Sequence, residues 1–257
     1  MPDAPPVLYD ALNSPAGRRV RITLLEKNLH AEVHWLNLAL MEQKRPAFLR
    51  INPNGTVPAL CHGDEMIFES AVICEYLDGI GTGPCLVPQD PRLQRRMREW
   101  IAYEQEWARP FREAIYETYA RERLRGSGIG AGELPARVGA NTTNPAWLHL
   151  AQSLLARGTD HAALADRVAI LMERLGWMEE QLADDRPWLL GDTFSLADVA
   201  LAPRIEMFPF IGVTDIAERF PRIGRFMSRM RERPSWEPSG SVPAPGVSRT
   251  FIGTGGS

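Results

Sequence analysis

The stretch from Asn52 to Leu60, Asn-Pro-Asn-Gly-Thr-Val-Pro-Ala-Leu, constrains the fold of this chain more than any other. A turn sequence leads directly into a short apolar run that contains a proline. Because proline has no N–H to give to a sheet, it is rarely tolerated inside a central strand. A Val57–Pro58 pair at a strand entrance is explained if its peptide bond is cis. The main-chain groups of Val57 would then turn away from the sheet and pair with an extended peptide ligand.

A second signal, Glu69-Ser70, opens a helical run from Ala71 to Leu77. The N-terminus of a helix offers N–H groups and the positive end of a dipole, which suits a carboxylate. Together with main-chain pairing at Val57, this arrangement would suit a small acidic peptide. The alternative interpretation of Glu69-Ser70 is an ordinary helix cap beside an unrelated acidic residue.

The first part of the chain reads as a small α/β unit of order βαβαββα. We expect strands at 7–10, 32–38, 57–61 and 66–68 and helices at 14–27, 42–49 and 70–78. The first helix has a well-marked start, since Ser14 is a good N-cap and Pro15 fits the first turn.

Helical patterning dominates the remainder. Helices are expected at 93–121, bent near Pro110, and at 145–155, 161–182, 195–211 and 220–231, with a loop or insertion at 126–144. Phe194-Ser195-Leu196-Ala197-Asp198 resembles a capping box and is interpreted as structural. We predict an α/β domain at 1–80, a linker at 81–91, an all-α domain at 92–237 and a Pro/Gly/Ser-rich tail at 238–257, either mobile or strapped onto the surface.

Composition narrows the functional classes. The formal charge of −3 gives no bulk attraction to nucleic acid. Three cysteines, Cys61, Cys74 and Cys85, have neither metal-ligand nor Cys-x-x-Cys spacing, so no metal is expected and the thiols suit a reducing compartment. The N-terminus does not read as a signal peptide and no apolar run is long enough for a membrane span. We therefore expect a cytoplasmic protein without a membrane partner.

The motif Asn-Pro-x-Gly-x-Val-Pro-Ala-Leu, followed by Glu-Ser and Ile-Cys-Glu-Tyr-Leu, resembles the glutathione-binding half of cytosolic glutathione transferases. The resemblance extends from about Val7 to Trp236. It implies a thioredoxin-like N-terminal domain with a mixed four-stranded sheet, an all-α C-terminal domain, a homodimer, glutathione as cosubstrate and a role in detoxification.

Ser14 is the candidate catalytic residue. Ser14-Pro15-Ala16-Gly17 is similar to the zeta- and tau-class pattern, in which a serine at this loop activates the thiol. A free cysteine thiol has a pKa near 8.5, and a hydroxyl that donates to the sulfur favours the thiolate. Asn13 is a possible second or replacement donor, and the alternative for Ser14 is a helix cap alone. No cysteine is present here, which excludes dithiol exchange at this position and disfavours omega-like chemistry.

The resemblance also assigns the glutathione contacts. Glu69 would bind the ammonium and Ser70 the carboxylate of the γ-glutamyl end, while Val57 and Pro58 present the main chain. Lys44, in a segment similar to a phi-class motif, would meet the glycine carboxylate, although a lone lysine is usually just solvated. Thr56 belongs to this set, but relatives often carry Gln or Lys there.

Tyr103 and Trp107 are the candidate residues of the electrophile pocket, on one predicted helical face with Trp100. Aromatic residues at this spacing are also typical of a core or a dimer contact, and that alternative stays open. The leading hypothesis is a glutathione transferase acting on a hydrophobic electrophile. The segment 126–155 resembles the enlarged middle of lignin β-etherases, so ether cleavage or isomerisation of bulky aromatic substrates is the alternative, and a non-catalytic ligand-binding or adaptor protein is another.

Overall fold

The computed structural model describes residues 4–38, 42–126, 132, 152–153, 156–157, 159–240 and 249–251. The expected insertion at 126–144 and the expected helix at 145–155 lie almost entirely outside these residues. Within the described residues, no helix combines the length and apolarity needed to cross a membrane.

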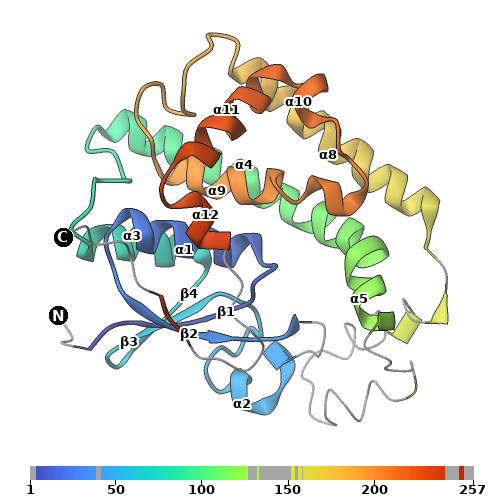
Figure 1. Ribbon diagram of the computed structural model, residues 1–257, viewed down its shortest axis with the longest axis horizontal. Coiled ribbons are helices and arrows are strands. Elements are labelled where there is room, and N and C mark those ends of the chain that lie inside the picture. The colour runs from blue at the N-terminus through green and yellow to red at the C-terminus, as the bar shows by residue number, and fades with distance from the viewer. Residues whose placement is uncertain are drawn as a thin grey trace.

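One mixed sheet forms the N-terminal part (Figure 1). Its strand order is β4-β3-β1-β2-β5. The strands are β1 (Val7–Asp10), β2 (Ala31–Trp35), β3 (Ala59–His62), β4 (Glu65–Phe68) and β5 (Arg249–Phe251). β1 and β2 are parallel, and the other pairs are antiparallel. The predicted four-stranded sheet is confirmed, and β5 adds a fifth strand to the edge of β2 that the sequence did not predict.

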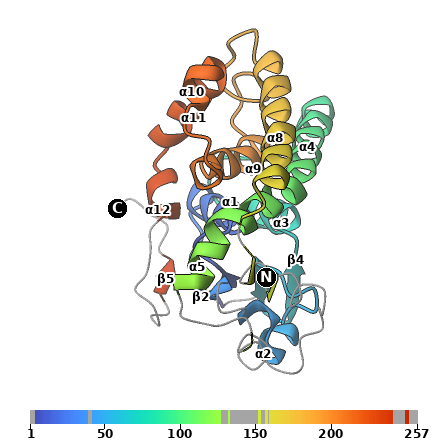
Figure 2. The same cartoon turned by 90° about the vertical axis from the view of Figure 1, so that its right-hand side faces the viewer.

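Helices cover both faces of this sheet. α1 (Pro15–Glu26) and α3 (Ser70–Ile80) lie between the sheet and the helical domain, whereas α2 (Pro46–Leu49) lies on the opposite side, after the short 3₁₀ turn η2 (Glu42–Lys44) (Figures 1 and 2). The predicted order βαβαββα is therefore confirmed. The proline in the first turn of α1 and the Ser14 cap explain why that helix begins where it does.

The C-terminal domain is helical. Its longest helix, α4 (Pro91–Ile115), passes Pro110 without ending and continues into a π-helical turn, η3 (Tyr116–Ala120), and then α5 (Arg121–Gly126). The other elements are α8 (His161–Gln181), α9 (Leu196–Ile205), η4 (Phe208–Ile211), α10 (Ile216–Arg219), α11 (Pro221–Glu232) and α12 (Trp236–Gly240). The long helix was predicted from the sequence. An irregularity was expected near Pro110, and the π-helical turn lies after it, at Tyr116–Ala120.

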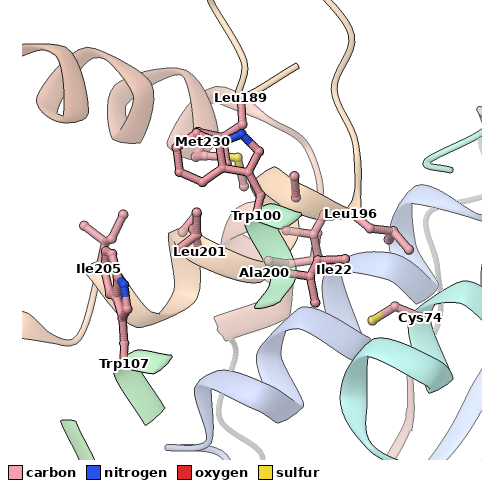
Figure 3. Packing of buried hydrophobic residues seen from close by; sticks show 14 of the residues in the cluster. Ile22, Cys74, Trp100, Trp107, Leu189, Leu196, Ala200, Leu201, Ile205 and Met230 are labelled. Carbon is pink, nitrogen blue, oxygen red and sulfur yellow. The ribbon is translucent and has the colours of Figure 1, made fainter. Parts of the chain in front are cut away.

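A continuous apolar core joins the two domains because α1 and α3 pack on α9. Figure 3 shows this region, with Ile22 of α1, Cys74 of α3, Trp107 of α4 and Ala200 of α9 among the buried side chains. At the start of α9 the capping box is confirmed, since Asp198 accepts from the backbone N–H of Ser195 at 2.8 Å.

Candidate functional site

The sheet topology brings the three predicted site segments to one edge. β3 runs antiparallel to β1, with Tyr9 opposite Ala59, so the end of β1 lies beside the start of β3. β4 is antiparallel to β3, with Phe68 opposite Ala59, so β4 ends at the same edge. The residues that follow β1, precede β3 and follow β4 are Ser14, Val57–Pro58 and Glu69–Ser70. These segments are far apart in the sequence and converge in the fold.

Ser14 caps α1 at this edge. Its Oγ accepts a hydrogen bond from the Gly17 backbone N–H at 3.0 Å, and the side chain is nearly buried. Accepting this bond uses an oxygen lone pair and leaves the hydroxyl hydrogen to act as a donor. Ser14 can therefore cap the helix and donate to a thiol at the same time. The structure shows the capping bond, and the thiol-activating role stays a prediction.

A buried ion pair supports the Ser14 loop, residues 11–14. Arg21 of α1 bonds Asp10 at the end of β1, and its Nη2 donates to the Leu12 carbonyl at 3.2 Å. A Cβ on Gly17 would lie 1.7 Å from Asp10 Oδ1, so only glycine allows this approach. Asp10 and Arg21 were not predicted as site residues, although an acidic residue at a strand end and a basic residue in the following amphipathic helix are visible in the sequence.

Val57–Pro58 is a cis peptide, as predicted. Strand β3 begins only at Ala59, and among the described residues no backbone hydrogen bond is formed by Val57. Ahead of it, buried Asn52 shapes the turn, because its Nδ2 donates to the Thr56 carbonyl at 2.8 Å and its Oδ1 accepts from Asn54 N–H at 3.0 Å. Thr56 is thus held by Asn52, a turn-forming residue that we had not assigned to the site.

Glu69 adopts a backbone conformation that is rare for any residue except glycine. Its φ is 63° and its ψ is 118°, and its side chain makes no capping hydrogen bond to α3. Ser70 begins α3 and is almost buried. Strained residues of this kind cluster at ligand sites, where the surrounding structure maintains them. The conformation is independent support for the functional interpretation of Glu69-Ser70.

Lys44 lies over the Asn52–Thr56 turn. Its Nζ donates to the Asn54 carbonyl at 3.2 Å, and a Cβ on Gly55, whose φ is 57°, would lie 2.8 Å from that nitrogen. Burial, followed by the positive charge of Arg112 on α4, lowers the pKa of the Lys44 ammonium. An anion bound here would relieve both effects, which fits the expectation of a carboxylate at Lys44.

Asn13 contacts the helical domain. Its Nδ2 donates to the Tyr119 hydroxyl at 2.7 Å, and Tyr119 belongs to the π-helical turn η3. The Tyr119 ring also meets the Phe210 ring of η4, with centroids 4.8 Å apart. Neither Tyr119 nor Phe210 was predicted as a site residue, because nothing local marks where a helix becomes a π-helix.

Trp107 lies in the helical core, and Tyr103 is partly buried beside it. Trp107 is completely buried and packs on Phe208, while the Tyr103 hydroxyl donates to the Arg174 carbonyl of α8 at 2.6 Å. The Tyr103 ring packs against the Trp177 ring, with centroids 4.4 Å apart and the ring planes tilted by 44°. Trp107 is thus a core residue, whereas Tyr103 is only partly buried. The electrophile-pocket role of both residues stays a prediction.

Two family models match this chain. One, described as the glutathione S-transferase N-terminal domain, covers residues 8–84, and the other, the glutathione S-transferase C-terminal domain, covers residues 161–229. Among curated proteins, glutathione S-transferase PARB of Nicotiana tabacum is 28% identical over 225 residues, which is 87% of this chain and 91% of the relative. Protein LigF of Sphingobium sp. strain SYK-6 is 40% identical over 87 residues, 33% of this chain and 34% of LigF.

Solved structures show the same architecture. Beta-etherase LigF from Sphingobium sp. strain SYK-6 has a TM-score of 0.78 at 24% identity, covering 92% of this chain and 98% of that chain. A glutathione S-transferase from Methylobacillus flagellatus KT, solved with GSH bound, has a TM-score of 0.68 at 23% identity, covering 92% and 100%. At these identities the likeness establishes the fold.

Proposed function

Because the chain belongs to the glutathione S-transferase family, we propose that it binds glutathione and transfers the glutathione sulfur to a hydrophobic electrophile. The observation that carries this proposal is the meeting of the Ser14, Val57–Pro58 and Glu69–Ser70 segments at one edge of the sheet. One segment supplies a hydroxyl, one supplies main-chain groups outside any strand and one supplies a helix start.

Each residue takes a defined part in this mechanism. The Ser14 hydroxyl donates to the glutathione sulfur and favours its ionised form, with the Asn13 amide as a second donor. Val57 pairs with the cysteinyl main chain, Ser70 and the α3 N-terminus bind the γ-glutamyl carboxylate, and Glu69 binds the ammonium. Lys44 binds the glycine carboxylate, beside Thr56 and the cis proline. The protein thus contributes pKa tuning and positioning.

The proposal extends to the assembly and its location. We keep the predicted division into domains at 1–80 and 92–237, with a homodimer as the working assembly. The three cysteines are all unpaired, which fits the reducing cytoplasm. A role in detoxification follows from the proposed activity.

Ser14→Gly is the sharpest test of the mechanism. Glycine keeps most of the helix-cap stability but removes the hydroxyl, whereas alanine would lose both. We expect conjugation of an activated aryl halide to slow by about tenfold or more, which is roughly 1.4 kcal/mol of transition-state stabilisation. Ser14→Thr, which retains cap and hydroxyl, serves as the matched control. An unchanged rate in Ser14→Gly would remove Ser14 from catalysis.

Binding is tested separately by thermal unfolding with glutathione. A ligand present at about one hundred times its Kd stabilises the native state by about 2.7 kcal/mol, so the melting temperature should rise. If millimolar glutathione causes no shift, the non-catalytic adaptor becomes the better interpretation.

Ether cleavage is the second candidate reaction, favoured by the 87-residue segment that is 40% identical to LigF, which is a beta-etherase. It uses the same thiolate on an aryl ether instead of an activated halide. Comparing the two substrate types at equal glutathione concentration distinguishes them, because each releases a different leaving group.

A further inference from the structure

Tyr119 makes a hydrogen bond between the two domains at the proposed thiol site. Its hydroxyl accepts from Asn13 Nδ2 at 2.7 Å, and Asn13 is the chain neighbour of Ser14. The Asn13 side chain is exposed, so it borders the open side of this edge. We propose that Tyr119 is a positioning residue that orients the Asn13 amide toward the glutathione sulfur and so helps to ionise the thiol.

The helical domain holds Tyr119 independently of Asn13. Its neighbour Glu117 is nearly buried, bonds the Arg157 guanidinium and accepts from the Asp160 backbone N–H at 3.1 Å. The Thr118 hydroxyl donates to the Ala114 carbonyl at 2.9 Å. These bonds fix the two residues of the π-helical turn that precede Tyr119, so the hydroxyl is presented to Asn13 from a well-anchored segment.

The π-helical turn decides where Tyr119 points. Successive residues of an α-helix are rotated by about 100°, so the extra residue that a π-turn accommodates redirects the side chains beyond it. Turns of this type occur frequently at functional sites. Figures 1 and 2 show the end of α4 and α5 descending from the helical domain to the level of the sheet. Tyr119 lies in this descending segment, and Phe210 supports its ring.

The remainder of the Ser14 loop is held by residues of its own α/β domain. Arg21 holds the Leu12 carbonyl, the Ser14 backbone N–H donates to the Ala11 carbonyl at 2.9 Å, and Ser14 Oγ is engaged at α1. The Asn13 side chain is the part of the loop that turns toward the helical domain. An amide nitrogen has two hydrogens, so Asn13 can donate one to Tyr119 and the other to a thiolate.

This inference rests on the proposed function, because it concerns ionisation of bound glutathione. Tyr119→Phe keeps the ring and its packing on Phe210 but removes the acceptor for Asn13. A neutral hydrogen bond at a partly exposed position corresponds to roughly half to one pKa unit of the thiol. We therefore expect the pKa of bound glutathione to rise by about that amount, with kcat reduced about three- to tenfold below this pKa and unchanged above it.

The assay is the thiolate absorbance of bound glutathione as a function of pH, for wild type, Tyr119→Phe, Asn13→Ala and the double variant. The double variant should shift no further than Asn13→Ala alone, because both changes remove the same oriented amide. Tyr76→Phe is the matched control, since it removes a tyrosine hydroxyl that lies 2.7 Å from the His62 ring, and neither residue belongs to the proposed site. It should lower the melting temperature and leave the titration curve in place.

Three results would overturn the inference. They are a Tyr119→Phe titration that superimposes on wild type, fully additive shifts in the double variant, or a rise in KM for the electrophile without any change of pH profile. The contact itself is tested without ligand by a double-mutant cycle on thermal unfolding, which must show coupling between Asn13 and Tyr119. Wild-type protein that binds no glutathione would instead refute the proposed function, and the inference with it.

Discussion

Glu104 is buried where α1, α4 and α9 meet, and two guanidiniums share its carboxylate. Arg19 Nη2 lies 2.7 Å from Glu104 Oε2, and Arg204 bonds Oε1. All three side chains are at least nine-tenths buried, with Glu104 at 1% exposure. Because Arg19 belongs to the α/β domain and the other two belong to the helical domain, this cluster joins the domains.

Glu104→Gln removes the shared negative charge and keeps the volume. Two buried guanidiniums would then lack their counter-ion, and breaking a buried ion pair typically costs about 3–5 kcal/mol. For a chain of this size about 1 kcal/mol lowers the melting temperature by roughly 2–4 °C, so the expected decrease is about 6–20 °C. Replacing Arg19, Glu104 and Arg204 together with methionine should recover most of this loss, because no charge remains buried.

The effect should also depend on pH. Burial alone would raise the pKa of the Glu104 carboxyl, but the Arg19 and Arg204 guanidiniums outweigh burial and hold that pKa below its usual range. A lowered native pKa gives stability that is present above the unfolded value, about 4.3, and is lost as the pH falls through the native value. The difference between wild type and Glu104→Gln should therefore be full at neutral pH and shrink below about pH 4.

Thermal unfolding by circular dichroism across this pH range measures the effect. Glu106→Gln is the control on the same helix, because Glu106 pairs with Arg174 at 2.8 Å but is half exposed. Such a surface pair should contribute less than about 1 kcal/mol. If Glu104→Gln lowers the melting temperature no more than Glu106→Gln, or if its effect is the same at every pH, the reasoning about the buried cluster is wrong.

Two further predictions concern other buried groups. Burial raises the pKa of the Cys74 thiol to about 11, so near pH 8 a disulfide reagent should label exposed Cys85 in native protein and Cys74 only after unfolding; rapid native labelling of Cys74 would contradict its placement. Asp198→Ala removes the acceptor for the Leu189 and Ser195 backbone N–H groups and should cost about 1–3 kcal/mol; an unchanged urea midpoint would count against this account of the α9 start.

Local chemistry made parts of the fold and of the candidate site predictable. The Ser14 cap, the cis Val57–Pro58 peptide and the Ser195 capping box depend on a few adjacent residues, and each is present as predicted. The roles of Ser14 and Val57 toward glutathione stay predictions. Their convergence required only the strand order of a βαβαββα unit.

Other features of the fold and of the candidate site depend on contacts between helices and strands that are far apart in the sequence, and local sequence patterns do not predict such contacts. Spacing placed Tyr103 and Trp107 on one helix, yet it could not tell that Tyr103 would bond a carbonyl of α8 or that Trp107 would be completely buried. Their role in an electrophile pocket stays a prediction. The contact of Tyr119 with Asn13 depends on a π-helical turn stabilised by bonds from the start of α8. Strand β5 pairs with β2 across almost the whole chain length, and a tail rich in Pro, Gly and Ser has no strong strand pattern.

Helix α12 is bonded directly to helix α1. Arg21 donates to the Ser239 carbonyl at 2.6 Å, across 218 residues of sequence, while it also holds the Leu12 carbonyl. Beside it, the Arg18 guanidinium lies 3.9 Å from the centre of the Trp236 ring. An affinity tag, a protease cut or a fusion partner introduced between residues 232 and 240 would therefore disturb the bonds through which Arg21 also supports the Ser14 loop. Engineers who need this end of the protein for immobilisation should attach their linkers beyond α12.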